Sequence, residues 1–192
     1  YFEGTSNSIQ VEVAFQFTES YTTDNTFSFV NNVRTKDGGT HEVGLKSAIT
    51  RSFNEYGRKY GFLKEKDANL DGAYIREGLT VIVSVRIPEN LLEFEGQTKA
   101  KLGSPEARNA VDSVVYENMN YFLEENRDLA STLMKKSLLA FKAYEAARNA
   151  RNEARLNNKK QKQDVILSGK LSPAQGKNKE INELFIVEGD SA

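Results

Sequence analysis

The chain has 192 residues, of which 39% are hydrophobic and 28% are charged, and its formal net charge is −1. These proportions are those of a soluble globular protein with one domain of ordinary size, or one domain and a fragment. No apolar run approaches the roughly 20 residues that span a bilayer, and no signal peptide is visible. Cysteine is absent, which excludes disulfides and thiolate metal sites, so we expect a cytoplasmic protein without membrane association.

The N-terminal part predicts two strands. Over residues 9–17 apolar residues alternate with mostly polar ones, a period of two that buries one face of a strand. A polar tract over residues 19–26 predicts a turn, and a second strand begins with Phe27 and Phe29. We expect the two strands to pair as an antiparallel hairpin with a long connection.

A helix follows the punctuation Asp37-Gly38-Gly39-Thr40, with Thr40 as its predicted cap and Gly61 at its end. Two glycines before a helix can bind a phosphate, although a simple turn is the more common use. The single histidine, His41, has no companion histidine or cysteine, so we expect a structural role. The buried stripe of the helix has spacings of three and four and comprises Leu45, Ile49, Phe53, Tyr56 and Tyr60.

An alternating strand from Leu79 to Val85, ended by Pro88, leads into the loop Phe94–Gly103. This loop contains an amide, a hydroxyl and two ammonium groups between two glycines. Such donors suit an oxyanion such as a phosphate, and a solvated polar turn is the alternative. The next helix is signalled by Ser104 as cap and Pro105 at its first position.

A second helical pattern restarts after Asn126-Arg127-Asp128 and continues to about Asn157. A helix of that length exceeds what a small domain can bury, so we expect it to project. Residues 134–170 include ten basic and three acidic residues, and Arg148, Arg151 and Arg155 share one helix face. This face predicts contacts with DNA phosphates, while a solvated helix with favourable dipole charges is the alternative.

The C-terminal part predicts a linker over 161–180 and a strand over 183–187, followed by Glu188-Gly189-Asp190. Carboxylates at the end of a strand commonly bind Mg²⁺. The chain has no initiating methionine and stops within this strand and loop, so we expect a piece of a longer protein.

Gln97-Thr98-Lys99, within Phe-Glu-Gly-Gln-Thr-Lys-x-Lys-Leu-Gly, resembles the nucleotide-reaching loop of the transducer domain in type IIA topoisomerase B subunits. Asn31-Asn32 with Asp37-Gly38-Gly39-Thr40-His41 agrees with this family. Residues 183–192 are similar to the opening of a TOPRIM domain, and residues 168–175 resemble bacterial topoisomerase IV more than gyrase.

The resemblance implies an α+β fold of the ribosomal-protein-S5 domain-2 type, with a left-handed βαβ crossover. It implies a transducer domain over residues 1–160 that includes the long projecting helix, then a linker over 161–180. Residues 181–192 would form the first strand and loop of a truncated TOPRIM domain. In this family the transducer joins an N-terminal ATPase domain of the GHKL type to the DNA-cleaving core.

The resemblance also implies that Gln97 and Lys99 contact the γ-phosphate of ATP, and that Glu188 serves acid–base chemistry and Mg²⁺ binding. ATP and Mg²⁺ would belong to the whole protein, and this piece alone would be inactive and bind neither tightly. The implied partners are the ATPase domain, the A subunit, double-stranded DNA and a second B subunit once ATP binds. Two alternatives stay open: a nucleic-acid-binding module of the same fold without nucleotide coupling, and a structural spacer.

Overall fold

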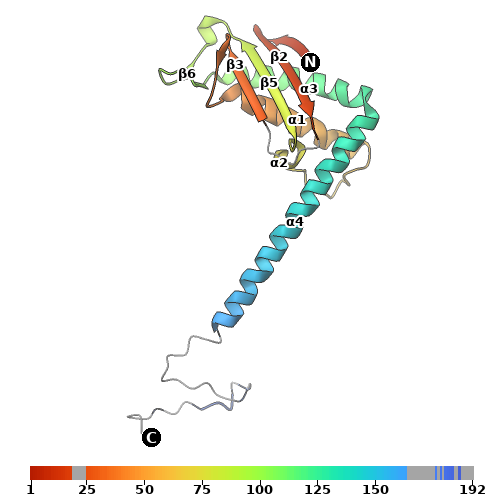
Figure 1. Ribbon diagram of the computed structural model, residues 1–192, viewed down its shortest axis with the longest axis vertical. Helices are drawn as coiled ribbons and strands as arrows, with labels where there is room; N and C mark the ends of the chain where they lie inside the picture. The colour runs from red at the N-terminus through yellow and green to blue at the C-terminus, as the bar shows by residue number, and fades with distance from the viewer. Residues whose placement is uncertain (19–24, 164–175, 177, 179, 184–185, 187–192) are drawn as a thin grey trace. The chain divides into compact units, whose positions relative to one another are not determined.

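The computed structural model describes residues 1–18, 25–163, 176, 178, 180–183 and 186. These residues belong to two compact units, Tyr1–Tyr144 and Glu145–Ala192. The chain has a mixed α and β architecture, and α1 and α3 cover one face of a five-stranded sheet (Figure 1). The elements are β1 (Phe2–Ser6), β2 (Ile9–Phe17), β3 (Asn25–Val30), β4 (Val33–Arg34), α1 (Thr40–Lys59), α2 (Gly72–Ile75), β5 (Leu79–Arg86), a 3₁₀ turn (Glu89–Leu91), β6 (Phe94–Glu95), β7 (Lys101–Leu102), α3 (Pro105–Glu125) and α4 (Arg127–Gln163).

The strand order in the sheet is β1-β2-β5-β3-β4. The prediction that β2 and β3 pair with each other is wrong, because β5 lies between them, antiparallel to β2 and parallel to β3. The inward side chains of β5, including Val81, Val83 and Val85, are buried. A strand this apolar is best placed at the centre, where both of its edges are hydrogen-bonded and one face meets the helices.

The core confirms the predicted periodicities. On β2 the alternating residues Ile9, Val11 and Val13 are buried, and the predicted stripe of α1 is buried from Leu45 to Phe53. The facing stripe of α3 contributes Val111, Val115 and Met119, which are also buried. Each large apolar side chain removed from water contributes about 1.5–3 kcal/mol, so these stripes hold the helices on the sheet.

Both predicted side-chain caps are wrong. Gly39 occupies the N-cap position of α1, and Thr40, already helical, donates its hydroxyl to the carbonyl oxygen of Ser104 at 2.6 Å. Ser104 does occupy the N-cap position of α3, but its hydroxyl is hydrogen-bonded to Glu93 and not to the helix. The hydroxyls that local sequence assigns to helix ends therefore tie α1, α3 and the segment before β6 together.

The restart of the helix after Asn126 is confirmed, and α4 continues to Gln163, three residues into the predicted linker. The described residues Glu183 and Ile186 are not in a strand, and the rest of the predicted C-terminal strand lies outside the described residues. In the part of the chain that the structure describes, no helix has the length and apolar character needed to cross a membrane.

Candidate functional site

The loop Phe94–Gly103 forms a short hairpin in which β6 pairs antiparallel with β7. Its turn is closed by the backbone N–H of Lys99, which donates to the carbonyl oxygen of Gly96 at 3.4 Å. Gly96 has a φ of +85° and Lys99 a φ of +53°. Left-handed backbone is uncommon for a lysine, so the turn holds the Lys99 backbone in a conformation that most residues avoid.

The two ammonium groups of the hairpin differ in their surroundings. Lys101 pairs with Glu95 across the hairpin, with 2.8 Å between Nζ and Oε2, and this hydrogen bond raises the pKa of Lys101. Lys99 has no ion-pair partner among the described residues, and its Nζ lies 6.0 Å from the ring centroid of Phe94. Lys99 and the neighbouring Gln97 are exposed, so both side chains are accessible to a ligand from outside the chain.

The base of the hairpin is fixed to the segment before α1, residues 35–39, which we call the hairpin seat. Asp37 donates its N–H to the carbonyl oxygen of Ala100 at 2.9 Å, and Leu102 donates to that of Gly38 at 3.0 Å. Leu102 is completely buried. Gly39 has a φ of +143°, and a Cβ there would lie 2.4 Å from the carbonyl oxygen of Leu102. The glycine pair thus permits a close backbone approach, which supports the turn interpretation of the sequence.

The other end of the hairpin is fixed to the start of α3. Gly103 donates its N–H to the carbonyl oxygen of Glu93 at 2.8 Å, and Glu93 donates its own N–H to Ser104 Oγ at 2.8 Å. Beside the hairpin is a hollow of about 420 Å³ lined by residues of the seat, the first turns of α1, Arg108 and both hairpin strands. The hairpin therefore joins the starts of the two helices that cover the sheet.

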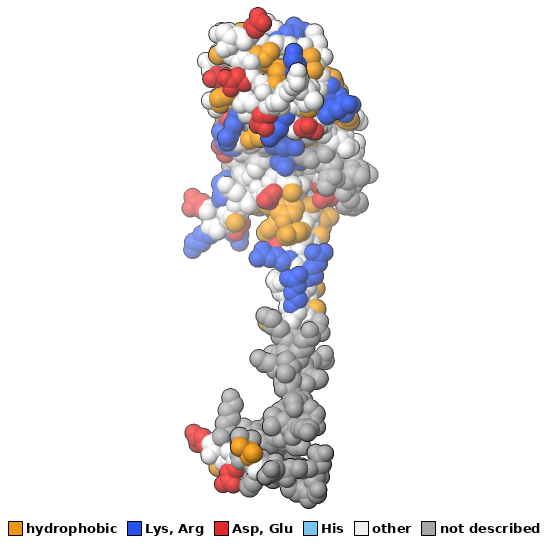
Figure 2. All heavy atoms as spheres, turned by 90° about the vertical axis from the view of Figure 1, so that its left-hand side faces the viewer, with side chains coloured by type: hydrophobic (Ala, Val, Ile, Leu, Met, Phe, Trp, Pro, Cys, Tyr) orange, Lys and Arg blue, Asp and Glu red, His pale blue; other side chains and the backbone are white. Residues whose placement is uncertain are grey.

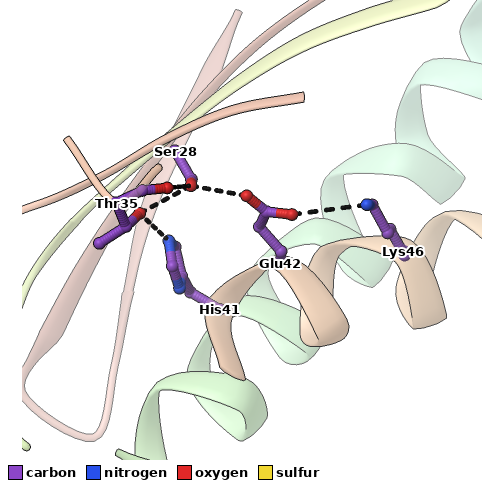
Figure 3. Close-up of polar contacts among 5 residues, drawn as sticks. All are labelled: Ser28, Thr35, His41, Glu42 and Lys46. Carbon is purple, nitrogen blue, oxygen red and sulfur yellow. Dashed lines mark hydrogen bonds and ion pairs between the residues drawn. The ribbon is translucent and has the colours of Figure 1, made fainter. Parts of the chain in front are cut away.

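A largely buried polar relay, made of Ser28, Thr35, His41 and Glu42, lies beneath the hairpin seat (Figure 3). The distances are 2.6 Å from Ser28 Oγ to Glu42 Oε1, 2.7 Å from Ser28 Oγ to Thr35 Oγ1 and 3.1 Å from Thr35 Oγ1 to His41 Nε2. Lys46 donates to the second oxygen of Glu42 at 3.4 Å. Burial lowers the pKa of His41 to about 4, so the imidazole is neutral at neutral pH. The predicted structural role of His41 is thereby supported.

The three arginines predicted to contact DNA are exposed side chains of α4, in the second compact unit. Arg148, Arg151 and Arg155 share one helix face because they are spaced by three and four residues. In the view of Figure 2, Lys and Arg side chains gather on α4. Glu188 lies outside the described residues, and no group of carboxylates and imidazoles in the described part could hold a metal ion.

The family model of DNA gyrase B matches residues 1–153. The chain belongs to the DNA gyrase B family. Among curated relatives of this gyrase B family chain, the B subunit of DNA topoisomerase 4 is 62% identical in Bacillus subtilis and 60% identical in Staphylococcus aureus. Each match covers the whole chain and 29% of the relative, so the chain spans less than a third of their length.

Two solved structures are similar in fold to the gyrase B family chain. The 43K ATPase domain of Thermus thermophilus gyrase B, in complex with an aminocoumarin, is 42% identical with a TM-score of 0.71. The match covers 78% of this chain and 39% of that one. The topoisomerase IV ATP-binding domain of Francisella tularensis, in complex with a small-molecule inhibitor, is 26% identical with a TM-score of 0.65, over 75% of this chain and 39% of that one.

These similarities confirm the predicted type IIA topoisomerase B subunit. The higher identity to the topoisomerase IV subunits than to the Thermus gyrase agrees with the resemblance seen at residues 168–175. The sequence did not reveal the pairing within the hairpin or the relay beneath its seat. The signal available was the motif Asp37–His41, whose glycines, threonine and histidine all turn out to contact the hairpin or the relay.

Proposed function

We propose that this chain is the transducer of a type IIA topoisomerase B subunit, with a fold of the ribosomal-protein-S5 domain-2 type. It couples ATP binding and hydrolysis in an adjoining GHKL domain to the passage of one DNA segment through another. The β6–β7 hairpin is the part that contacts the γ-phosphate. The observation that carries this proposal is an exposed Gln97 and Lys99 at the tip of a hairpin whose base is tied to the starts of α1 and α3.

Lys99 supplies the larger share of the interaction with the nucleotide. A unit charge about 4 Å from a phosphate oxygen interacts by roughly 4 kcal/mol at an effective dielectric of 20, before desolvation is subtracted. Lys101 is engaged with Glu95, which leaves Lys99 as the ammonium group at the tip. The amide of Gln97 adds a neutral hydrogen bond, which is generally weaker than a charge-assisted one.

Hydrolysis changes what the hairpin touches. Once the γ-phosphate leaves, Gln97 and Lys99 lose their partner, and the hairpin is free to shift. Its base bonds to Gly38, just before α1, and Glu93 bonds to Ser104, just before α3. A shift of the hairpin is therefore passed to the two helices that pack on the sheet, since a packed core moves between discrete arrangements.

Several components of this mechanism belong to the whole protein. ATP with its Mg²⁺ is bound outside this chain, consistent with the matched region being only 39% of the similar ATPase-domain structure. Glu188 contributes to a TOPRIM site for Mg²⁺ and acid–base chemistry. The A subunit, duplex DNA and a second B subunit are the partners, and Arg148, Arg151 and Arg155 contact DNA phosphates.

A second candidate is a nucleic-acid-binding module without nucleotide coupling. The exposed face formed by Arg148, Arg151 and Arg155 favours it, because arginines on a helix can follow a phosphate backbone. The two candidates differ in their response to ATP. DNA binding by the intact subunit that is unaffected by ATP would favour the second candidate.

The proposal is tested by ATP turnover of the intact B subunit carrying Lys99→Ala. We expect a loss of tenfold or more, because each 1.36 kcal/mol lost at the transition state lowers the rate tenfold. Gln97→Ala should cost less. The matched control is Lys66→Ala, which removes the charge of another exposed lysine in the same unit. Turnover of Lys99→Ala within about twofold of the control would remove Lys99 from the mechanism.

A further inference from the structure

The relay beneath the hairpin seat has a defined direction, because each hydroxyl has only one proton. The carboxylate of Glu42 accepts, so Ser28 donates to it across 2.6 Å in preference to the longer 3.1 Å contact with the carbonyl oxygen of Thr35. Thr35 must then donate to Ser28, and its oxygen accepts from His41 Nε2. His41 is therefore the neutral tautomer that carries its proton on Nε2.

The other ring nitrogen of His41 agrees with this assignment. Nδ1 is buried and has no hydrogen-bond partner in the described part of the chain. A bare lone pair in that position costs less than a buried N–H or a buried cation without a partner. The relay thus runs one way, from the imidazole through two hydroxyls to a carboxylate that Lys46 also contacts.

We propose that His41 is a positioning residue for ATP turnover, which holds the β6–β7 hairpin in place through Thr35 and the hairpin seat. This inference rests on the proposed function of the hairpin. His41 contacts no nucleotide in this account. It acts by fixing the side chain of Thr35, the first residue of the seat, in a single orientation.

The contacts from the relay to the hairpin are continuous. Thr35 accepts the N–H of Gly38 on its carbonyl oxygen at 3.1 Å, and the carboxylate of Glu42 lies so close to Gly38 that a Cβ there would be 2.9 Å from it. Gly38 in turn accepts the N–H of Leu102, the last residue of β7. Loss of the His41 donor would free Thr35 and loosen the backbone on which β7 is held.

The first test compares His41→Leu with His41→Gln in the intact B subunit. Leucine has similar bulk but no donor, whereas the terminal amide of glutamine places an N–H near the position of Nε2. We expect His41→Leu to lower turnover at saturating ATP about tenfold and His41→Gln to restore it to within about threefold of wild type. Affinity for ADP should not change, because the hairpin contacts only the γ-phosphate.

A second pair covers the case in which His41→Leu does not fold. Thr35→Val keeps the shape of the side chain and removes the hydroxyl, while Thr35→Ser keeps the hydroxyl. We expect Thr35→Val to lower turnover about tenfold and Thr35→Ser to stay within about threefold of wild type. Ser52→Ala is the control, because Ser52 is another buried hydroxyl of this unit, on α1, and has no partner among the described residues.

The relay and the proposed function fail in different ways. If Lys99→Ala has no effect on turnover, the function of the hairpin is wrong. If Lys99→Ala lowers turnover but folded Thr35→Val is as active as Thr35→Ser, only the relay is wrong. A positioning role also predicts that Thr35→Val has no further effect in the Lys99→Ala background, since both changes act on the same contact. Multiplied losses in the double variant would show a general structural effect and overturn the inference.

Discussion

The buried imidazole of His41 makes a defined contribution to the pH dependence of stability. Its pKa is about 4 in the folded chain, against 6.5 when unfolded, because burial disfavours the charged form. Between these values the unfolded state binds more protons, so the stability from His41 is complete above about pH 6.5 and is lost as the pH falls toward 4. The full difference is about 3 kcal/mol, of which about 2 kcal/mol is lost between pH 7 and pH 5.

The assay is urea unfolding of the chain at pH 7 and pH 5, with His41→Gln as the matched variant. Glutamine does not titrate and keeps a donor toward Thr35, so other titrating groups cancel in the comparison. Wild type should lose about 2 kcal/mol more than the variant between the two values of pH, or roughly 4–8 °C in the unfolding midpoint. Equal losses would mean that folded His41 accepts a proton freely, which contradicts its burial in the relay.

Three further predictions address other parts of the chain. Gly39→Ala should destabilise the chain by about 1–3 kcal/mol in urea unfolding, since its Cβ would meet the Leu102 backbone, whereas Gly61→Ala, which has open space around it, should cost no more than about 1–2 kcal/mol; equal costs would contradict the close approach. Replacing Arg148, Arg151 and Arg155 by alanine should weaken duplex binding by the intact subunit whatever the sequence, and lower the slope of log affinity against log salt by up to about 0.9 per phosphate contact; an unchanged slope would leave them as solvating residues. The isolated chain should show no ATP hydrolysis and no DNA cleavage, with or without the A subunit, and activity that persists at a constant level through purification would contradict this.

Periodicity in the sequence predicted the elements of the core but not their neighbours. The alternation in β2 and β5 defines which face of each strand is buried, and the structure confirms it at Val11 and Val83. Alternation carries no information about which strand lies beside which. The expected pairing of β2 with β3 therefore failed, because the more apolar β5 occupies the centre of the sheet.

The candidate site was predictable in composition but not in construction. Gln97 and Lys99 were identified from the loop motif, and the structure places both on an exposed turn. The hydroxyls of Thr40 and Ser104 carry a local signal for helix caps, yet each makes a contact that depends on tertiary structure. The relay through His41 joins residues of β3, the seat and α1, and such a pairing has no signature in local sequence.

The central claim is that the hairpin contacts the γ-phosphate, and nucleotide affinity tests it most directly. The measurement compares the binding of a non-hydrolysable ATP analogue and of ADP to the intact B subunit, as wild type and as Lys99→Ala. The account predicts that the substitution weakens the triphosphate analogue tenfold or more, about 1.4 kcal/mol, and leaves ADP within about twofold. An equal loss for both nucleotides, or no loss for either, would contradict it.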